Sequence, residues 1–216
     1  MRGIFVTGTG TEVGKTVLAA TIAHTAAAAG RRVAVFKAAV SGLDEGGEAD
    51  HELLRRAAGS TQEDDEIAPY RFGPPVSPHL GAELAGEPID PVQLLAAARA
   101  AGEDADALVV EGVGGFHVPL TLDYLVSDLA RDLALPVAIA AAPGLGTINH
   151  SLLTIEAVRA AGLEPVAVVL TPWPAEPGAV ERSNREAIER IGRVAAHTLA
   201  RLDLAEPDSW PALDLL

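Results

Sequence analysis

The chain alternates short apolar runs with longer segments in which apolar residues recur every three or four positions. The short runs contain few polar residues, which is typical of strands buried on both faces of a parallel sheet. The longer segments are typical of helices that pack on such a sheet. The pattern predicts strands at 3–6, 32–36, 107–111, 137–141 and 165–170. It predicts helices at 14–29, 49–58, 91–102, 122–133, 147–160 and 179–196.

This alternation predicts an α/β fold of three layers, a mostly parallel sheet with helices on both faces. A length of 216 residues suits one α/β domain, so we expect residues 1–216 to form a single unit. Ligands of such sheets bind at the carboxyl ends of the strands. The residues that directly follow each predicted strand are therefore the candidates for function.

The first predicted strand leads into Val-Thr-Gly-Thr-Gly-Thr-Glu-Val-Gly-Lys-Thr at residues 6–16. A strand, a glycine-rich loop, Lys-Thr and a helix in this order predict a phosphate-binding loop (P-loop) and a P-loop NTPase-like fold. Lys15 would reach the β- and γ-phosphates, and the Thr16 hydroxyl would ligate Mg²⁺. Five residues separate Gly8 from Gly14, one more than in the common motif. The residues expected to bind nucleotide here are Gly10, Thr11, Glu12, Val13, Gly14, Lys15, Thr16 and Val17.

Polar residues also follow the second predicted strand. Lys37 comes directly after it, where a lysine can point toward the P-loop and converge with Lys15 on one crevice. The alternative is a lysine that extends to the surface. Asp50 begins the next predicted helix and is either a ligand or merely an N-terminal charge or cap. Ser41, taken alone, is typical of a turn.

The third predicted strand ends at Glu111, and glycines follow it. A carboxylate at this position can hold Mg²⁺ opposite Thr16, and glycines allow the backbone to approach a ligand closely. The alternative is a structural ion pair between Glu111 and Lys37, and both interpretations can hold at once.

The last two predicted strands lead to weaker signals. Gly146 and Thr147 precede a helix, whose N-terminus can receive an anion such as a substrate carboxylate. Thr171-Pro172-Trp173 follows the fifth strand, at an edge where a nucleobase would lie. Trp173 would either stack on the base or pack on its own loop.

Composition narrows the choice of partners. The chain has no cysteine, which excludes disulfides, thiolate metal sites and a cysteine nucleophile, and which fits a cytoplasmic protein. The formal net charge of −14 argues against nucleic acid or an anionic membrane as a partner. No signal peptide is visible, and the apolar runs are too short to span a membrane. The six histidines show no metal-ligand spacing.

Together these motifs resemble dethiobiotin synthetase, the ATP-dependent enzyme family that closes the ureido ring in biotin biosynthesis. The resemblance covers most of the chain and includes the extra residue of the P-loop. The segments that carry it are 6–16, Lys37 with Ser41-Gly42, Asp50, Pro-Val-Ser-Pro-His at 75–79, Val-Glu-Gly-Val-Gly-Gly at 110–115 and Gly-Thr-Ile-Asn-His-Ser-Leu-Leu-Thr at 146–154.

The resemblance implies a cyclo-ligase that acts on 7,8-diaminopelargonic acid, CO₂ or bicarbonate, and a nucleoside triphosphate. One amine takes up CO₂ to give a carbamate, which receives the γ-phosphoryl group of ATP. The second amine then attacks the mixed anhydride and closes the ring, releasing ADP and phosphate. The family resemblance also implies a homodimer, with the diamine acid near the interface.

The resemblance also assigns roles to particular residues. The catalytic residues would be Thr11, Lys15 and Lys37, and the Mg²⁺ ligands Thr16, Asp50 and Glu111. Beyond the P-loop, the nucleotide would contact Glu111, Gly112, Thr171, Pro172 and Trp173. The diamine acid would contact Thr11, Lys37, Ser41, Gly114, Gly146, Thr147, Ile148 and Asn149.

The chain departs from the family pattern in three places. Lys37-Ala38-Ala39-Val40 stands where members commonly have Lys-Pro-Val, which changes loop rigidity more than chemistry. Thr171-Pro172-Trp173 stands where many members carry an asparagine that reads adenine, so the co-substrate is ATP or another nucleoside triphosphate. Residues 181–185 read Glu-Arg-Ser-Asn-Arg where some members place a tyrosine near the substrate carboxylate.

A nucleotide-switch ATPase of the related partitioning and metallochaperone class is the alternative function. Such proteins share the P-loop fold and act on a protein partner. The chain lacks cysteines for metal delivery and a membrane-targeting amphipathic tail, which argues against this class.

Overall fold

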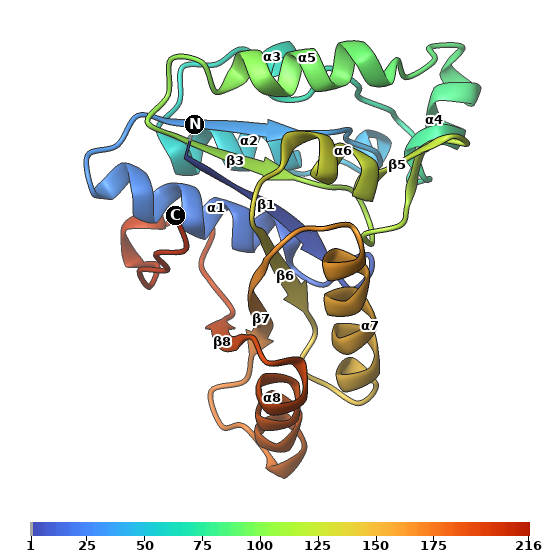
Figure 1. The fold of residues 1–216 in the computed structure, drawn as a ribbon. Helices are drawn as coiled ribbons and strands as arrows, with labels where there is room; N and C mark the ends of the chain where they lie inside the picture. The colour runs from blue at the N-terminus through green and yellow to red at the C-terminus, as the bar shows by residue number, and fades with distance from the viewer. Residues whose placement is uncertain (1) are drawn as a thin grey trace.

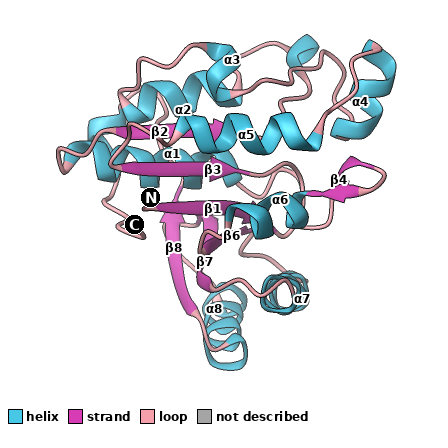
Figure 2. Cartoon of the chain, turned by 45° about the horizontal axis from the view of Figure 1, so that its top comes forward, coloured by secondary structure: helices cyan, strands magenta, loops and turns pink. Residues whose placement is uncertain are grey.

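The computed structural model describes residues 2–216, and its six-stranded sheet lies between two layers of helices (Figures 1 and 2). The strand order is β2-β3-β1-β6-β7-β8, and all neighbours are parallel. The predicted fold class is therefore confirmed. The strands are β1 (Gly3–Gly8), β2 (Val33–Lys37), β3 (Ala107–Glu111), β6 (Val137–Ala141), β7 (Pro165–Trp173) and β8 (Ala195–Ala200).

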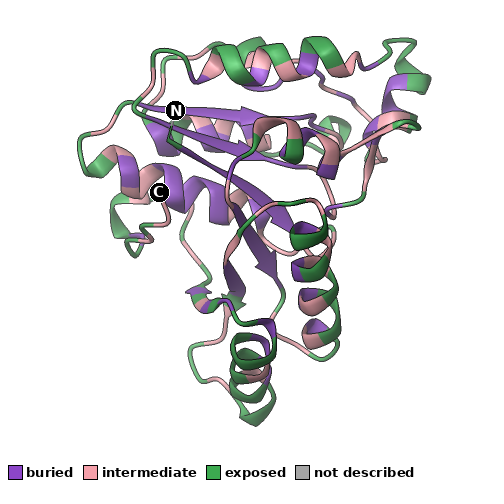
Figure 3. Cartoon of the chain, viewed as in Figure 1, coloured by how far each residue is buried: buried purple, intermediate pink, exposed green. Residues whose placement is uncertain are grey.

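Helices cover both faces of the sheet, and β1, β2, β3 and β6 are buried throughout, whereas the edge strand β8 alternates between buried and exposed residues (Figure 3). Along β1, Phe5 belongs to the core on one face, whereas Ile4 and Val6 belong to the core on the other, as the alternation of side chains in a strand requires. The face of Ile4 is covered by α1 (Lys15–Ala28) and α2 (Asp50–Ala58). The face of Phe5 is covered by α5 (Pro91–Ala101), α6 (Val126–Leu133), α7 (Thr147–Ala160) and α8 (Ala179–Gly192). No helix within residues 2–216 is long and apolar enough to cross a membrane.

Two predicted helices differ from the structure at their ends. The helix predicted at 122–133 begins only at Val126, because β4 (Pro119–Thr121) and β5 (Tyr124–Leu125) form a short antiparallel hairpin before it. The Asp128 carboxylate accepts the N–H of Leu125 at 2.8 Å and so marks the start of α6. The helix predicted at 179–196 ends at Gly192, since Arg193 adopts a left-handed conformation with φ of 50° and β8 follows.

The sequence pattern also missed three short elements and the role of the C-terminal segment. The short elements are α3 (Asp64–Ile67), α4 (Pro78–Ala85) and a 3-10 turn at Leu43–Glu45. The segment 201–216 packs on α1, and a 3-10 turn at Pro207–Ser209 precedes Trp210. Trp210 is buried edge-on to His24, with ring centroids 5.6 Å apart, and its indole N–H donates to the Asp203 carbonyl at 2.7 Å.

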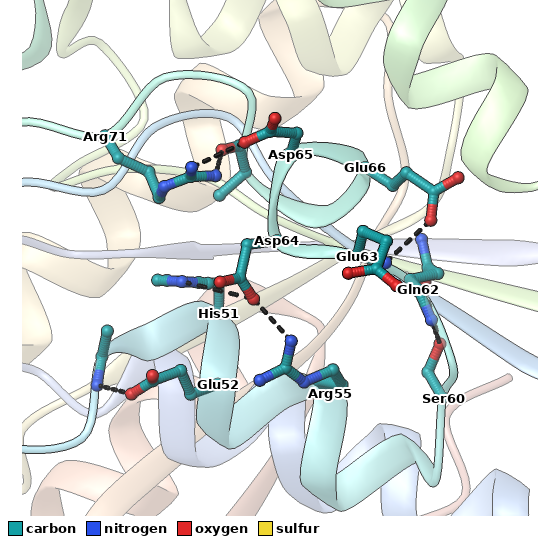
Figure 4. A network of polar contacts seen from close by, with 12 residues as sticks. His51, Glu52, Arg55, Ser60, Gln62, Glu63, Asp64, Asp65, Glu66 and Arg71 are labelled. Atoms are coloured by element: carbon teal, nitrogen blue, oxygen red, sulfur yellow. Dashed lines mark hydrogen bonds and ion pairs between the residues drawn. The ribbon is translucent and has the colours of Figure 1, made fainter.

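A polar network joins α2 to α3 (Figure 4). The Asp64 carboxylate accepts from Arg55 at 2.5 Å and lies 3.8 Å from Nε2 of His51. Gln62 joins the same region to β2, because its side-chain amide accepts from the N–H of Val35 at 2.9 Å and donates to the carbonyl of Val35 at 3.1 Å. These contacts fix α2 against the edge strand of the sheet.

His51 in this network predicts a pH dependence of stability. Burial lowers the pKa of His51 below its ordinary value, so the fold favours the neutral ring. As the pH falls below about 6.5, His51 binds a proton in the unfolded chain before it does so in the folded protein. The free energy of unfolding therefore decreases from about pH 6.5 down to the lower pKa of His51 in the folded protein. We expect chemical denaturation to show this loss, and His51→Gln to reduce it. A matched change at the exposed His150, H150Q, should leave it intact; an equal reduction there would contradict this origin.

Candidate functional site

A cavity of about 630 Å³ opens at the carboxyl ends of β1, β2 and β3. The three strands are neighbours in the sheet, and their register places Lys37 opposite Glu111 and Val6 on the other side of Glu111. Residues as distant in sequence as Val6 and Glu111 therefore meet at one edge of the sheet. The predicted site residues that line this cavity are Thr11, Glu12, Gly14, Lys15, Thr16, Val17, Lys37, Ser41, Asp50, Glu111 and Gly114.

Four polar side chains of the cavity form one connected cluster. Nζ of Lys37 lies 2.6 Å from Oε1 of Glu111 and 2.7 Å from Oδ2 of Asp50. The Thr16 hydroxyl lies 2.9 Å from Oδ1 of Asp50 and 3.0 Å from Oε1 of Glu111. The helix that begins at Lys15 thus brings Thr16 to two carboxylates that come from β3 and α2.

This cluster decides three of the alternatives left open by the sequence. The Lys37 side chain is only 4% exposed, so the interpretation in which it extends to the surface is wrong. The ion pair between Lys37 and Glu111 is confirmed. Asp50 is an acidic residue in the first turn of α2 but not its N-cap, which is Ala49; its carboxylate contacts Lys37 and Thr16.

Burial and neighbouring charges set the ionisation of the cluster. Burial alone would lower the pKa of Lys37, but the charges of Glu111 and Asp50 outweigh it and raise that pKa. Burial opposes the charge of Asp50 as well, yet Lys37 and the bond from Thr16 hold the pKa of Asp50 below its ordinary value. Burial raises the pKa of the fully buried Glu111, although Lys37 opposes this. A second cation beside Glu111 would therefore stabilise its charged form.

The P-loop has the backbone that its glycines predict. Gly14 lies at the N-cap of α1 with φ of 84°, a left-handed conformation that side chains disfavour. Its α-carbon faces the methyl group of Thr171, which a β-carbon on Gly14 would approach to 2.5 Å. Nζ of Lys15 donates to the Gly10 carbonyl at 2.8 Å, and burial lowers the pKa of Lys15.

The donor set at the cluster fits a magnesium ion. Oε2 of Glu111 is buried and has no hydrogen-bond partner among the described residues, so an acceptor oxygen remains for a cation. Thr16 and Asp50 add a hydroxyl and a carboxylate oxygen beside it. No group of three acidic, histidine or cysteine residues within 2–216 could hold a metal by itself. Mg²⁺ suits such a site, because it uses one or two carboxylates and completes its shell with phosphates and water.

A second cavity of about 290 Å³ lies on the other side of the P-loop, beneath the first turn of α7. Thr11 lines both cavities and so separates them. Thr147 contributes to the second cavity, whereas Gly146, Ile148 and Asn149 do not line it. Its other lining residues are Thr9, Gly10, Val13, Ala142, Gly144, Leu145 and His150.

The structure places four other predicted nucleotide contacts outside these cavities. Gly112 packs closely beside Val126 and Phe5. Thr171 is buried against the P-loop, Pro172 follows it through a cis peptide bond, and Trp173 packs partly against the core. Their roles toward a nucleotide stay predictions.

Sequence reasoning missed residues that shape both cavities. Glu45, Glu48, Leu53 and Leu204 line the larger one. The Asn184 amide donates to the carbonyls of Pro143 and Gly144 at 2.9 and 3.0 Å and so fixes the loop before α7. Asn184 could have been found from its spacing, because it lies one helical turn before the buried Ile188. The segment that contains Leu204 carries no such signal.

Comparison with solved structures supports the fold. The chain is similar to the signal recognition particle 54 kDa protein from Aeropyrum pernix in complex with GDP, with a TM-score of 0.57 and 14% identity over 95% of this chain and 42% of that one. At this identity the likeness concerns the fold alone, and it agrees with a P-loop NTPase-like architecture.

Comparison of the sequence identifies the family. Residues 2–209 match a family model described as an AAA domain. An ATP-dependent dethiobiotin synthetase BioD from Anaeromyxobacter dehalogenans is 44% identical over 79% of this chain and 76% of the relative. Enzymes of the same name from Rhodococcus erythropolis and Bacillus subtilis are 39% and 36% identical, over 90% and 88% of this chain and 86% and 83% of the relatives. The chain therefore belongs to the ATP-dependent dethiobiotin synthetase family.

Proposed function

We propose that this protein joins CO₂ to 7,8-diaminopelargonic acid and closes the ureido ring of dethiobiotin at the expense of a nucleoside triphosphate. The observation that carries the proposal is the cluster of Lys37, Asp50, Glu111 and Thr16 beside the P-loop, in one cavity. A triphosphate and a carbamate both carry negative charge, and this cavity offers two lysines and oxygen ligands for a cation. The family membership supports the same reaction.

The residues of the cavity suit phosphoryl transfer, which requires positioning and charge neutralisation more than covalent chemistry from the protein. Lys15 would bind the β- and γ-phosphates, and Lys37 would bring the carbamate oxygen toward the γ-phosphorus. Thr16, Asp50 and Glu111 would hold Mg²⁺, which supplies further neutralisation of the phosphate charge when bound. The anhydride forms as the bond from the γ-phosphorus to the β,γ-bridging oxygen breaks and ADP leaves.

Ring closure then needs an orienting site rather than a protein base. The second amine of the substrate attacks the carbonyl carbon of the anhydride, phosphate departs with the bonding electron pair, and the amine proton passes to phosphate or solvent. Thr11 and Ser41 would orient the carbamate end by hydrogen bonds, beside the Gly114 backbone. The substrate carboxylate would bind at the α7 N-terminus formed by Gly146–Asn149.

Further parts of the proposal concern the assembly and the co-substrate. We propose that the protein acts as a cytoplasmic homodimer with the diamine acid near the interface, and that residues 1–216 work as one P-loop domain. Thr171, Pro172 and Trp173 stand where many relatives read adenine, so ATP or another nucleoside triphosphate would serve. The backbone of Gly112 would complete the nucleotide site.

One assay tests the reaction directly. Protein, Mg²⁺, bicarbonate and 7,8-diaminopelargonate are incubated with each of the four nucleoside triphosphates in turn. We expect dethiobiotin, identified by mass, and phosphate in equal amounts. Phosphate release that is indifferent to the diamine and is stimulated by a protein partner would instead support a nucleotide-switch ATPase.

A substitution tests the cation site separately. Thr16→Val keeps the shape of the side chain but removes the hydroxyl that contacts Asp50 and Glu111, so we expect the Mg²⁺ concentration for half-maximal velocity to rise about tenfold or more. Thr21→Val is the matched control, since its hydroxyl lies in the same helix and bonds only the Val17 carbonyl. An unchanged Mg²⁺ requirement in T16V would contradict the assignment.

A further inference from the structure

Two segments that are distant in sequence form part of the wall of the main cavity. Glu48 belongs to the loop between β2 and α2, and Leu204 belongs to the irregular segment that follows β8. The loop contains Gly42, Gly46 and Gly47, all with positive φ, and neither segment is fixed by strand pairing at these residues. Backbone hydrogen bonds from Gly42, Leu43 and Asp44 anchor the first part of the loop, and the Trp210 indole holds the Asp203 carbonyl beside Leu204. A further contact joins the two walls to each other.

Arg56 provides that contact. Its Nε and Nη2 donate to the two carboxylate oxygens of Glu48 at 2.9 and 2.7 Å, and its Nη1 donates to the Leu204 carbonyl at 2.7 Å. A guanidinium can serve both partners at once because its donors form a rigid planar fork. Arg56 itself does not line the cavity. It lies on α2 six residues after Asp50, so the helix that carries Asp50 to the charged cluster also ties the two walls together.

The position of this bridge indicates which part of a nucleotide it affects. Lys15, Thr16 and Lys37 form the charged part of the cavity, where phosphates and a cation fit. Its apolar lining includes Val17, Leu53 and Leu204, which suit a ribose and one face of a base, whereas Thr171, Pro172 and Trp173 stay predicted contacts of the base outside this cavity. Leu204 is thus a wall residue whose backbone is fixed by Arg56.

We propose that Arg56 is a positioning residue for the nucleotide: it fixes Glu48 and Leu204 so that the sugar and base end of the cavity is formed before binding. The inference rests on the proposed function only in taking a nucleotide as the ligand of this cavity. Loss of the bridge leaves the phosphate contacts intact but adds the ordering of two segments to the cost of binding.

The side chains of Arg56 and Glu48 are each 37% exposed, so the bridge contributes little to global stability. This separates a positioning role from a merely structural one. We expect Arg56→Ala to raise the KM for nucleotide, and the Kd for ADP measured by calorimetry, by about 3- to 10-fold. The turnover number and the KM for the diamine should stay within about twofold. Arg56→Lys, which can keep one partner at a time, should give an intermediate Kd.

Arg32→Ala is the matched control. Arg32 forms a similar two-pronged pair with Asp106 at the opposite end of β2, with contacts of 3.1 and 3.3 Å, away from the cavity and more exposed than the pair of Arg56 and Glu48. We expect it to leave the Kd for ADP unchanged. If R56A and R32A gave the same Kd for ADP, or if R56A lowered turnover and weakened both substrates equally, the proposed role would be wrong.

A double-mutant cycle with Glu48→Gln completes the test. If Arg56 acts through Glu48, the losses of ADP affinity in the two single variants should not add in the double variant. Fully additive losses would contradict action through Glu48. ADP calorimetry does not depend on ring closure, so it tests the inference separately from the proposed reaction. If the wild-type protein formed no dethiobiotin, the proposed reaction would be wrong. If R56A still lost ADP affinity in that case, the inference about Arg56 would be supported.

Discussion

Lys37→Ala is expected to lower the turnover number about 10³-fold, the upper range for removing one charge-stabilising group from an active site. The Lys37 ammonium lies within 2.7 Å of both carboxylates of the cluster and faces the cavity that also contains Lys15. In the proposed reaction it neutralises charge on the carbamate and the γ-phosphate as the anhydride forms. Rapid-quench measurement of dethiobiotin formation tests this, and near-normal ring closure by K37A would contradict the role of Lys37.

Loss of activity in K37A has to be separated from loss of the fold. Removing one partner of a buried ion pair commonly costs about 3–5 kcal/mol, because the remaining charge is left in a poor environment. Burial already raises the pKa of Glu111, so a proton can replace the missing cation, and Asp50 is partly exposed. The double variant Lys37→Ala/Glu111→Gln removes the charge of Glu111 as well. We expect it to melt at a higher temperature than K37A and to remain as inactive.

Gly14→Ala is expected to weaken nucleotide binding by about 100-fold or more. The left-handed conformation of Gly14 costs a side-chain-bearing residue roughly 1–2 kcal/mol, and the new β-carbon would lie 2.5 Å from the Thr171 methyl group. Contact at that distance forces the buried Thr171 side chain or the P-loop backbone to move. The Kd for ADP from calorimetry measures the result, and an affinity within threefold of wild type would contradict it.

Gly30→Ala is the control for backbone strain. Gly30 has φ of 81°, almost the same as Gly14, yet a β-carbon there would meet nothing within 4 Å. We expect G30A to lower the free energy of unfolding by about 1–2 kcal/mol and to leave ADP binding unchanged. The double variant Gly14→Ala/Thr171→Ser removes the clash with the Thr171 methyl group but keeps the backbone strain at residue 14. The difference in ADP affinity between this variant and G14A therefore measures the effect of the clash alone.

Much of the charged cluster could be predicted from the sequence, because its members stand at strand ends or at the start of a helix. In a parallel sheet, the ends of neighbouring strands meet at one edge, so the sequence alone predicts that Lys37 and Glu111 lie close together. What could not be predicted was their contact geometry. A single lysine shared by two carboxylates depends on the position of α2, whose residues Leu53, Leu54 and Ala57 pack in the core with α1.

The remaining errors come from segments where local propensity and tertiary packing disagree. The alanine-rich residues around Ala195 favour a helix locally, but pairing with β7 makes them strand β8. The turn at 122–123 carries no glycine or proline, so the β4–β5 hairpin gave no signal. Leu204 lies in an irregular segment that Trp210, Arg56 and packing on the core hold in place, and such long-range contacts leave no periodic pattern in the sequence.

The central place of β1 in the sheet has a consequence for synthesis on the ribosome. Its two neighbours are β3 and β6, so the first strand to be made can complete no ladder until residues 107–111, and on its other side 137–141, have followed. Until then, an apolar segment and the loop beyond it remain without partners, a situation in which chaperones protect nascent chains. The phosphate-binding loop is therefore synthesised early but can fold only after β3 and β6 have been synthesised.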